Sequence, residues 1–259
     1  MSLAPFRSRA RSAGLALVAG LSALTACNRT QLVQGDCRPA NGADVCTWGE
    51  TAGGTLVAFG ATVPMTAIEN APDDAPMTWP PLATAVIPMP EAVRSATGFQ
   101  SLTMFWEPHG HPPGPYLTPH FDFHFNTADV RPIDCADTTK PAQLPAGYAL
   151  PDMTDPELGT LVGLCVPKMG MHALPQAALS DTAIFKAAML VGYYHGQPVF
   201  LEPMIARATL LERRSFPLTW PAVPDHPAAV RMPATFRAEY DSTAQAYRFV
   251  FSGLTPAGS

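Results

Sequence analysis

The feature that most constrains the fold is the number of prolines, 29 in a chain of 259 residues. A proline inside a helix removes a backbone hydrogen bond and clashes with the preceding turn, so a chain this rich in proline is unsuited to long helices. Prolines repeatedly interrupt residues 71–90 and 129–160, which we expect to be irregular. We therefore predict a mainly β fold, either an antiparallel β-barrel or a β-sandwich, with long proline-rich loops and at most short helices.

Short apolar runs between these loops predict the strands. Residues 187–194 and 199–210 flank the polar turn "HGQP" and predict a long β-hairpin, although helix formers over 181–190 leave a helix as the alternative. A short helix is expected over 91–97, because a proline precedes it and a glycine follows it. Further strands are expected at "TLVAFG" (55–60), "FQSLTMFWEP" (99–108), "HFDFHF" (120–125), the start of 159–173 and a closing hairpin over 235–253.

The first residues have the pattern of a bacterial secretory signal. Three arginines and no acid precede an apolar run over residues 13–26, which is too short to span a bilayer. The segment "LTAC" (24–27) is similar to a lipobox, in which the cysteine is lipidated and becomes the first mature residue. We predict that residues 1–26 are a lipoprotein signal peptide and that Cys27 anchors the chain to a membrane of the bacterial cell envelope, outside the cytoplasm. An ordinary signal peptide with a nearby cysteine is the alternative.

The charge of the chain excludes one class of partner. Cleavage after residue 26 removes three arginines and no acid, so the formal net charge changes from −5 to −8. No basic run follows the signal, whereas nucleic-acid binding requires clustered Lys and Arg to neutralise phosphates. We therefore exclude nucleic acid and expect a small molecule or a metal ion as the partner besides the membrane. The sequence leaves open whether the chain forms homo-oligomers.

Four cysteines follow the lipobox, and an even number in an exported chain predicts two disulfides. No CxxC occurs, so the spacing does not indicate a structural zinc site. We expect residues 27–46 to form a tether with a small cysteine loop, ahead of a single mainly-β domain at residues 47–259. The most local of the three connectivities pairs Cys37 with Cys46 and Cys135 with Cys165.

Four histidines lie within residues 109–124, and two of them alternate with phenylalanine in "PHFDFHFN" (119–126). On a strand, this alternation puts His120, Asp122 and His124 on one face and three phenylalanines on the other, which we expect to be core. Residues two apart are separated by about 6.8 Å and can share an ion, whereas residues four apart are separated by about 13 Å. One ion should therefore take only one of the two histidines, unless a bulge shortens the strand.

Partners for these residues are expected elsewhere in the chain. Glu202 lies among apolar residues, where a carboxylate needs a partner or a metal ion. His172 follows a turn, and His111 lies in a proline-glycine loop before the strand. Histidine and carboxylate ligands without thiolate suit zinc, manganese or iron. Nearby methionines are typical of copper(I) sites, but methionine is more often core filler, so copper is the less favoured choice. We predict a divalent metal site formed by His120, Asp122, His124, His172 and Glu202, with His111 as an additional ligand.

Three segments resemble a bacterial domain family of unknown function, found in exported proteins and lipoproteins and marked by PHFDFHF, MGxH and FLEPM segments. They are "GHPPGPYLTPHFDFHFN" (110–126), "MGMHA" (169–173) and "YHGQPVFLEPMIARATL" (194–210), in the order of the family. The resemblance covers roughly residues 95–212, and it implies site positions without naming a reaction. Asn126 and Ala173 replace an aromatic residue and a tryptophan, which implies altered packing beside the site. The implied positions are His111, His120, Asp122, His124, His172 and Glu202.

Three functions agree with these residues. The first is a metal-dependent enzyme that activates water at the ion, with a histidine outside the ligand set as acid or base. The second is a non-catalytic envelope protein that binds a metal ion or a small ligand. The third is a structural or oligomeric module, in which the histidines and acids only hydrogen-bond one another.

Overall fold

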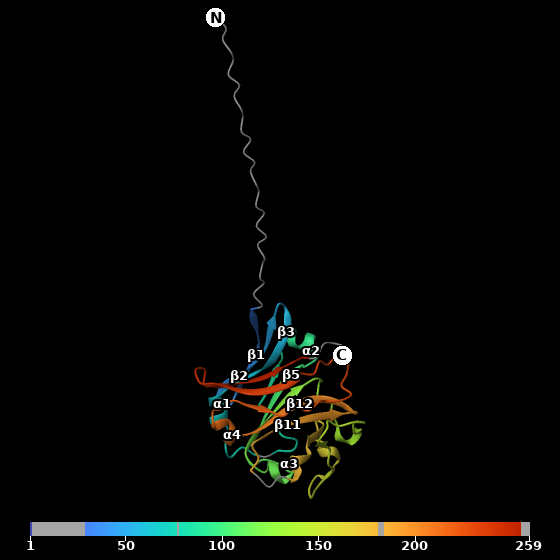
Figure 1. Cartoon of the computed structure of the whole chain (residues 1–259). Coiled ribbons are helices and arrows are strands. Elements are labelled where there is room, and N and C mark those ends of the chain that lie inside the picture. Colours follow the sequence, from blue (N-terminus) through green and yellow to red (C-terminus); the bar gives the residue numbers. More distant parts are fainter. Residues whose placement is uncertain (2–28, 77, 181–183, 255–259) are drawn as a thin grey trace.

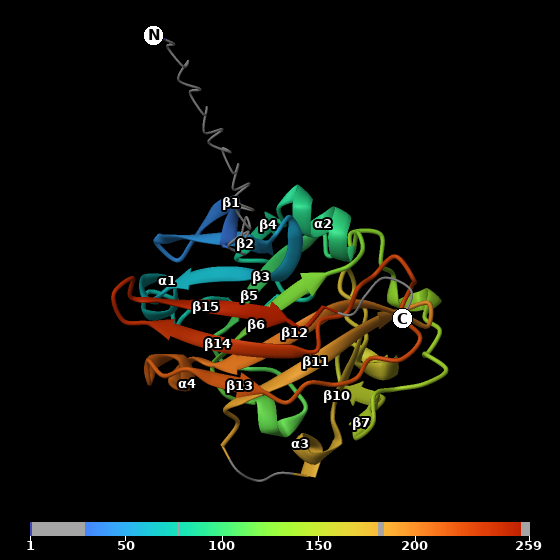
Figure 2. The ribbon, with the colours of Figure 1, turned by 45° about the horizontal axis from the view of Figure 1, so that its top comes forward.

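The computed structural model describes residues 1, 29–76, 78–180 and 184–254, so the expected signal peptide after Met1 and the lipobox Cys27 lie outside the described residues. The described chain forms two stacked antiparallel sheets joined by long loops and short helices (Figures 1 and 2). Within this part of the chain, no helix is long and apolar enough to cross a membrane.

The two large sheets are named sheet I and sheet II. Sheet I has the strand order β1 (Thr30–Ala40), β2 (Ala43–Ala52), β3 (Thr55–Pro64), β15 (Ala246–Ser252), β14 (Thr235–Asp241) and β13 (Phe216–Leu218). Sheet II has the order β4 (Ala85–Pro88), β5 (Ser101–Glu107), β6 (His120–Asn126), β12 (Gln197–Ala206), β11 (Ala187–Tyr194), β10 (Met171–Pro175) and β7 (Tyr148–Ala149). Both sheets stay open, so the fold is a mainly β sandwich rather than a barrel.

The remaining elements are short. A separate two-stranded sheet pairs β8 (Met153–Asp155) with β9 (Gly159–Leu161). The α-helices are α1 (Met65–Glu69), α2 (Glu91–Thr97), α3 (Gln176–Ser180) and α4 (Arg207–Leu211), and the 3-10 turns are η1 (Gly114–Tyr116), η2 (Cys135–Asp137) and η3 (Val162–Leu164). The predicted limit to short helices is therefore confirmed over the described residues.

The core lies between the two sheets. Phe121, Phe123 and Phe125 of β6 are fully buried there, as the alternation predicted. The ring of Phe123 meets that of Phe249 on β15 at 4.6 Å, and Phe125 meets Phe251 at 4.7 Å. Such aromatic contacts bury a large apolar area at the centre of the sandwich. The polar residues of β6 consequently face away from the core, on the outer side of sheet II.

Several predicted elements are confirmed. β11 and β12 form the long hairpin, and β14 and β15 form the closing one. α2 ends at Gly98, which has the left-handed φ of 82° expected for a residue after a helix. The helix alternative over 181–190 is wrong for the described residues 184–190, because residues 187–190 already pair with β12. Sheet pairing overrides the local helix propensity here.

Residues 30–46 differ from the expected tether, and that prediction is wrong for this stretch. They form β1 and the first part of β2, with Cys37 directly opposite Cys46 and joined to it by a disulfide. The turn between the strands is Asn41–Gly42, with φ of 47° and 87°. Asn-Gly is typical of tight hairpin turns because both positions need positive φ. The domain therefore begins at β1.

Both predicted disulfides form. The second, between Cys135 and Cys165, spans 30 residues of the proline-rich excursion between β6 and β10. Part of this excursion packs on the outer face of sheet II, where Ile133 meets Phe105 and Phe200. Disulfides persist in oxidising compartments, so the two bonds agree with an extracytoplasmic protein.

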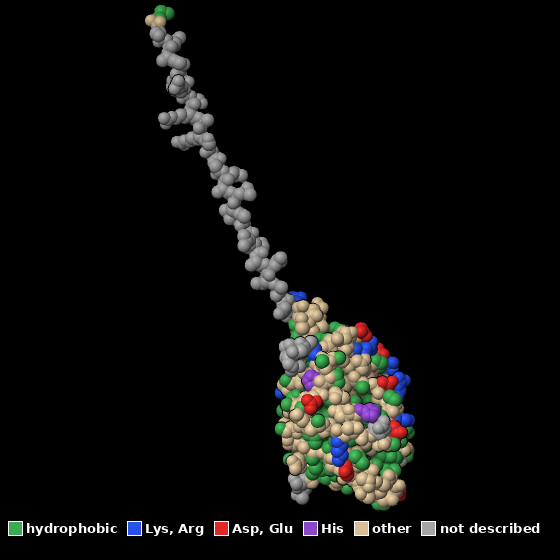
Figure 3. Space-filling view, turned by 90° about the vertical axis from the view of Figure 1, so that its right-hand side faces the viewer, with side chains coloured by type: hydrophobic (Ala, Val, Ile, Leu, Met, Phe, Trp, Pro, Cys, Tyr) green, Lys and Arg blue, Asp and Glu red, His purple; other side chains and the backbone are tan. Residues whose placement is uncertain are grey.

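The surface combines charged and apolar side chains. Figure 3 shows one face, on which basic side chains mostly lie next to acidic ones. Ion pairs elsewhere in the described chain have the same character, for example Arg131 with Asp129 and Lys140 with Asp152. Exposed pairs of this kind contribute little stability, so the free energy of folding comes mainly from the sandwich core.

Gly60 in β3 marks a place where sheet I leaves no room for a side chain. A methyl group there would lie 1.6 Å from the carbonyl oxygen of Phe249 on β15. Gly60→Ala should therefore lower the free energy of unfolding by about 2 kcal/mol or more, measured by urea denaturation. In the control Gly114→Ala, the added methyl meets no atom within 4 Å, and the change should stay below about 0.5 kcal/mol. Equal effects of the two substitutions would contradict the strand packing described here.

Candidate metal centre

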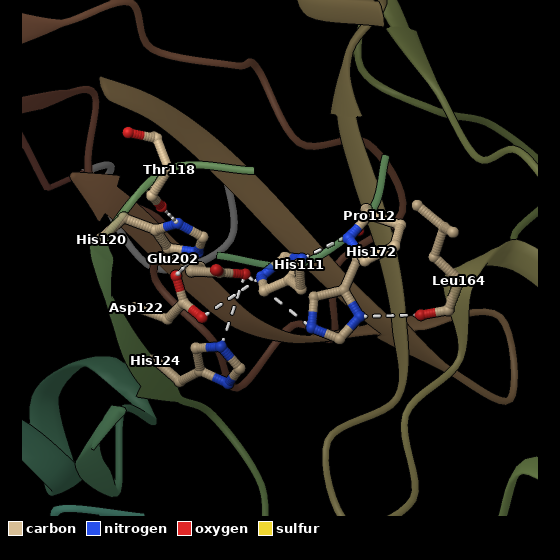
Figure 4. Close-up of polar contacts among 9 residues, drawn as sticks. All are labelled: His111, Pro112, Thr118, His120, Asp122, His124, Leu164, His172 and Glu202. Carbon is tan, nitrogen blue, oxygen red and sulfur yellow. Dashed lines mark hydrogen bonds and ion pairs between the residues drawn. The ribbon is translucent and has the colours of Figure 1, made fainter. Parts of the chain in front are cut away.

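The outer face of sheet II carries the polar residues that alternate with the core phenylalanines. His120, Asp122 and His124 of β6 are all buried, with at most 6% of their surface exposed. Glu202 of β12 lies beside His124, because β12 pairs in register with β6 on either side of it. Figure 4 shows these side chains converging with two further histidines, His111 and His172.

Site A consists of His124, His172 and Glu202, whose ligand atoms all lie within 4.8 Å of one another. Glu202 Oε2 lies 3.4 Å from His124 Nε2 and 3.9 Å from His172 Nε2. The three residues come from β6, β10 and β12, so strands far apart in sequence build the site. Glu202 is 1% exposed and His124 is 2% exposed.

The ring of Phe200 supports site A from one side. It stacks on the imidazole of His124 with centroids 4.2 Å apart and lies 5.1 Å from that of His172. The ring occupies space over Gly192, where an added methyl would come within 2.0 Å of it. Gly192 is also the strand partner of His172, so its missing side chain lets the aromatic ring reach both histidines.

Site B consists of His111, His120 and Asp122, also with ligand atoms within 4.8 Å of one another. Asp122 Oδ1 lies 3.2 Å from His120 Nε2, and Asp122 Oδ2 lies 3.6 Å from His111 Nε2. His111 reaches the site from the loop before β6, because Gly110 turns the chain with a φ of 66°. A methyl at Gly110 would lie 2.1 Å from the carbonyl oxygen of Tyr116, so only glycine fits this turn.

Backbone carbonyls orient three of the four imidazoles. A carbonyl oxygen can only accept a hydrogen bond, so the imidazole Nδ1 must carry the proton and, in the neutral ring, Nε2 is left as the ligand atom. Metal-binding histidines are typically oriented in this way. Nδ1 donates to Pro112 O in His111 (2.8 Å), to Thr118 O in His120 (2.7 Å) and to Leu164 O in His172 (3.0 Å).

Buried polar atoms in both sites find no hydrogen-bond partner among the described residues. They are His120 Nε2, Asp122 Oδ1 and Glu202 Oε2. A buried polar atom without a partner is destabilising, and native proteins contain few of them. Nine buried side-chain atoms of the described chain lack a partner in all, and three of them fall in these two small sites, as expected if each site binds an ion. The two sites are therefore able to hold metal.

Burial sets the protonation of site A. It lowers the pKa of His124 to about 4 and that of His172 to about 3, so both imidazoles are neutral at neutral pH. Burial, together with the charge on Asp122, raises the pKa of Glu202 well above its usual range. Neutral imidazoles are the form that binds a metal ion, and a bound cation would favour the ionised carboxylate.

In site B, unlike site A, the pKa shifts favour the charged forms of the carboxylate and of one histidine. Burial alone would raise the pKa of Asp122, but the interactions with His120 and His111 outweigh it and hold that pKa well below its usual range. In turn, contact with Asp122 outweighs the burial of His111 and raises its pKa to about 9. Titratable groups shifted by both burial and a specific partner are concentrated at functional sites.

A cavity of about 400 Å³ opens over the two sites. Ligands of both sites border it, and much of its remaining wall is apolar. Its size lies in the range of small-molecule sites. No lysine or arginine of the described chain lines it. The apolar wall includes Tyr116, Leu158, Leu161, Leu164, Met169 and Met204.

Glu107 also lines this cavity, and the sequence analysis missed it. It ends β5 directly opposite His120 and is 6% exposed. Burial and the charge on Asp122 raise its pKa to about 7. The signal that could have found it is the one used for Glu202, an acid at an otherwise apolar strand. Phe200 and Gly192 were missed because an aromatic residue and a glycine in a strand carry no mark of a site.

The structure brings all six predicted residues to one face but divides them between two sites. β6 pairs with β5 without a register shift, so no bulge draws His120 and His124 together. The prediction that one ion cannot take both agrees with this arrangement. The other three histidines lie elsewhere: His109 is exposed, His195 is in the turn between β11 and β12, and His226 is half-buried in a loop.

Comparison of the chain with protein-family models, with curated proteins and with solved structures gave no match. The function must therefore be inferred from the geometry and chemistry of the centre itself. The resemblance to the family of unknown function stays a prediction.

The raised pKa of Glu107 predicts how stability depends on pH. The unfolded chain ionises this carboxyl near pH 4.5, whereas the folded chain keeps it protonated up to about pH 7. Between these values the native state binds the extra proton, so stability falls as the pH rises. Glu107→Gln removes this loss and should make the metal-free protein more stable than wild type by about 3 kcal/mol at pH 8. Urea denaturation in EDTA at several pH values measures the difference in free energy of unfolding between the variant and wild type. A difference that does not grow from about pH 5 to about pH 8 would contradict a buried carboxyl with a raised pKa.

Proposed function

We propose that this chain is a lipid-anchored enzyme of the bacterial cell envelope that uses a divalent metal ion in site A to activate water. Its substrate is a small, uncharged and largely apolar molecule that is hydrolysed in the cavity. The observation that carries the proposal is the position of the three ligands of site A beside an open cavity of about 400 Å³. Structural metal sites are closed by four protein ligands, whereas catalytic sites keep a position open for water or substrate.

The unpartnered atoms favour an ion over a purely structural network. In a hydrogen-bonded cluster, Glu202 Oε2 and His120 Nε2 would each have a donor or an acceptor, yet neither has one among the described residues. A buried acceptor without a partner costs about 1–3 kcal/mol, which a structural module would have no reason to retain. A cation in site A would supply the missing partner of Glu202 Oε2, and the partner of His120 Nε2 would have to come from site B.

The ligand chemistry narrows the choice of ion. Two imidazoles and a carboxylate suit zinc, manganese or iron. Copper is the less favoured ion, although Met169 and Met204 border the cavity. Met171 lies in the core between the sheets, so it cannot serve as a ligand there.

The residues around the cavity would have three roles in hydrolysis: metal binding, proton transfer and contact with the substrate. His124, His172 and Glu202 hold the ion, which as a Lewis acid would lower the pKa of a water molecule. Glu107 borders the same cavity at its site B end, opposite His120, and through an intervening water it would accept the proton that the attacking water loses and return it to the leaving oxygen as the carbon–oxygen bond of the substrate breaks. The apolar wall contacts the rest of the substrate, and the lack of a lysine or arginine in the described lining disfavours an anionic substrate.

Metal content tests the first half of the proposal. The full chain, expressed with its own N-terminus, should carry stoichiometric zinc, manganese or iron by mass spectrometry of its metals. His124→Ala and Glu202→Ala should lower the metal content of site A at least about tenfold, because each removes one of three ligands. His109→Ala alters an exposed histidine near site B and should leave the content unchanged. Wild-type protein without stoichiometric metal would refute the proposal.

Hydrolysis of neutral chromogenic esters with short acyl chains tests the second half. Glu107→Gln should slow the reaction by about 100-fold or more while the metal content stays at the wild-type level, because only proton transfer is lost. Removing the metal with a chelator should abolish the reaction, and adding it back should restore it. A protein that binds metal but hydrolyses none of these esters would instead favour the non-catalytic metal-binding alternative.

The lipid anchor at Cys27 is tested by cell fractionation. Cys27→Ser removes the thiol that would be acylated, so the protein should move from the membrane fraction to the soluble fraction. The mass of the purified wild-type protein should also exceed that of the polypeptide by the mass of the lipid. A wild-type protein found only in the soluble fraction would support the ordinary signal peptide.

A further inference from the structure

We infer that the centre holds two divalent cations side by side, one in site A and one in site B, with the carboxylates of Asp122 and Glu202 between them. The inference rests on the metal binding of the proposed function, and it adds a second ion together with the residues that hold it. Under this inference, His111, His120 and Asp122 of site B are themselves metal ligands and do not merely support site A.

Site B repeats the ligand set of site A, with two imidazoles and one carboxylate. Ligands about 2.1 Å from a tetrahedral ion lie about 3.4 Å from each other. In site B the carboxylate oxygens of Asp122 lie 3.2 Å from His120 Nε2 and 3.6 Å from His111 Nε2. In site A the corresponding separations are 3.4 Å and 3.9 Å. Both sites thus have the spacing of atoms that surround one ion each.

A single ion cannot use both ligand sets. His120 and His124 are four residues apart on a strand that pairs without a register shift, so their Cα atoms are separated by about 13 Å. A histidine reaches an ion only about 6–7 Å beyond its Cα, so the two rings would have to stretch straight towards each other, which leaves no common point for both rings and their carboxylates. If both sites bind metal, the centre therefore holds two ions.

Unpartnered buried atoms occur in both sites, not in one alone. Site A contains Glu202 Oε2, and the residue is 1% exposed. Site B contains Asp122 Oδ1 and His120 Nε2, in residues that are 6% and 0% exposed. An ion in site A would satisfy the first of these atoms and leave the other two without a partner. A second ion satisfies them.

The two sites adjoin through their carboxylates. Met204 on β12 is the register partner of Asp122 on β6, so Glu202, two residues before Met204, is a diagonal neighbour of Asp122 on the same face. Figure 4 shows the two carboxyl groups next to each other between the imidazoles of the two sites. Hydrolytic centres with two metals hold the ions about 3.5–4 Å apart, where both can contact one substrate.

Stoichiometry with zinc tests the inference on the full chain. After removal of its metals and dialysis against zinc, wild-type protein should bind two ions per chain. His172→Ala in site A and His111→Ala in site B should each bind one, and His109→Ala, in the same loop as His111, should bind two. Circular dichroism and thermal unfolding establish that each variant is folded. The paramagnetic resonance spectrum of wild-type protein loaded with manganese is a second measurement that needs no variant, and it should show two spin-coupled ions.

The outcomes separate this inference from the proposed function. One ion per chain in wild type, with no loss in His111→Ala, would overturn the two-ion centre and leave metal binding by site A intact. An uncoupled manganese spectrum would overturn it as well. No bound ion at all would overturn the proposed function together with the inference.

Discussion

The alternation along β6 is the interaction on which the rest of the structure depends. On one side of the strand, Phe123 and Phe125 pack against Phe249 and Phe251 and close the core between the sheets. On the other side, Asp122 and His124 line the cavity and His120 lies buried beside them. A slip of one residue would exchange the two faces, placing buried charge in the core and phenylalanine at the ligand positions. The packing that stabilises the sandwich therefore also holds the ligands in place.

Burial gives the centre its chemistry. Enclosed carboxylates are destabilising unless a cation or a hydrogen bond compensates them, and Asp122 and Glu202 each retain an oxygen without a hydrogen-bond partner in the described chain. The same enclosure keeps the imidazoles of His124 and His172 neutral, as ligands must be. Much of the cover comes from the excursion between β6 and β10, which the Cys135–Cys165 disulfide ties together. This long loop has no regular structure over most of its length. By covering the outer face of sheet II, it encloses the cavity between itself and the strands.

Local signals in the sequence predicted the elements whose residues carry a strong pattern. Alternation identified β6, the turn "HGQP" identified the β11–β12 hairpin, and the glycine after α2 identified its end. The β1–β2 hairpin was missed although Asn41–Gly42 marks it, because β1 is largely exposed and lacks an apolar periodicity. Glu107 was missed because it ends its strand next to a loop, where an acid is ordinarily exposed to solvent. Strand geometry predicted that one ion would not take both His120 and His124, and the structure places the two residues in different groups.

By itself, the sequence determined the mainly β character and the polar and apolar faces of β6, and it predicted two disulfides and six residues that the structure brings to one face (Figure 4). Only the tertiary structure decided their grouping, with His172 and Glu202 joining His124, and His111 joining His120 and Asp122. It also placed Glu107 and the cavity beside them. The reason is physical: neighbours along a strand are set by its repeat, whereas neighbours across a sheet depend on strand order and register. Those depend on how the whole sandwich packs, and no spacing along the chain encodes them.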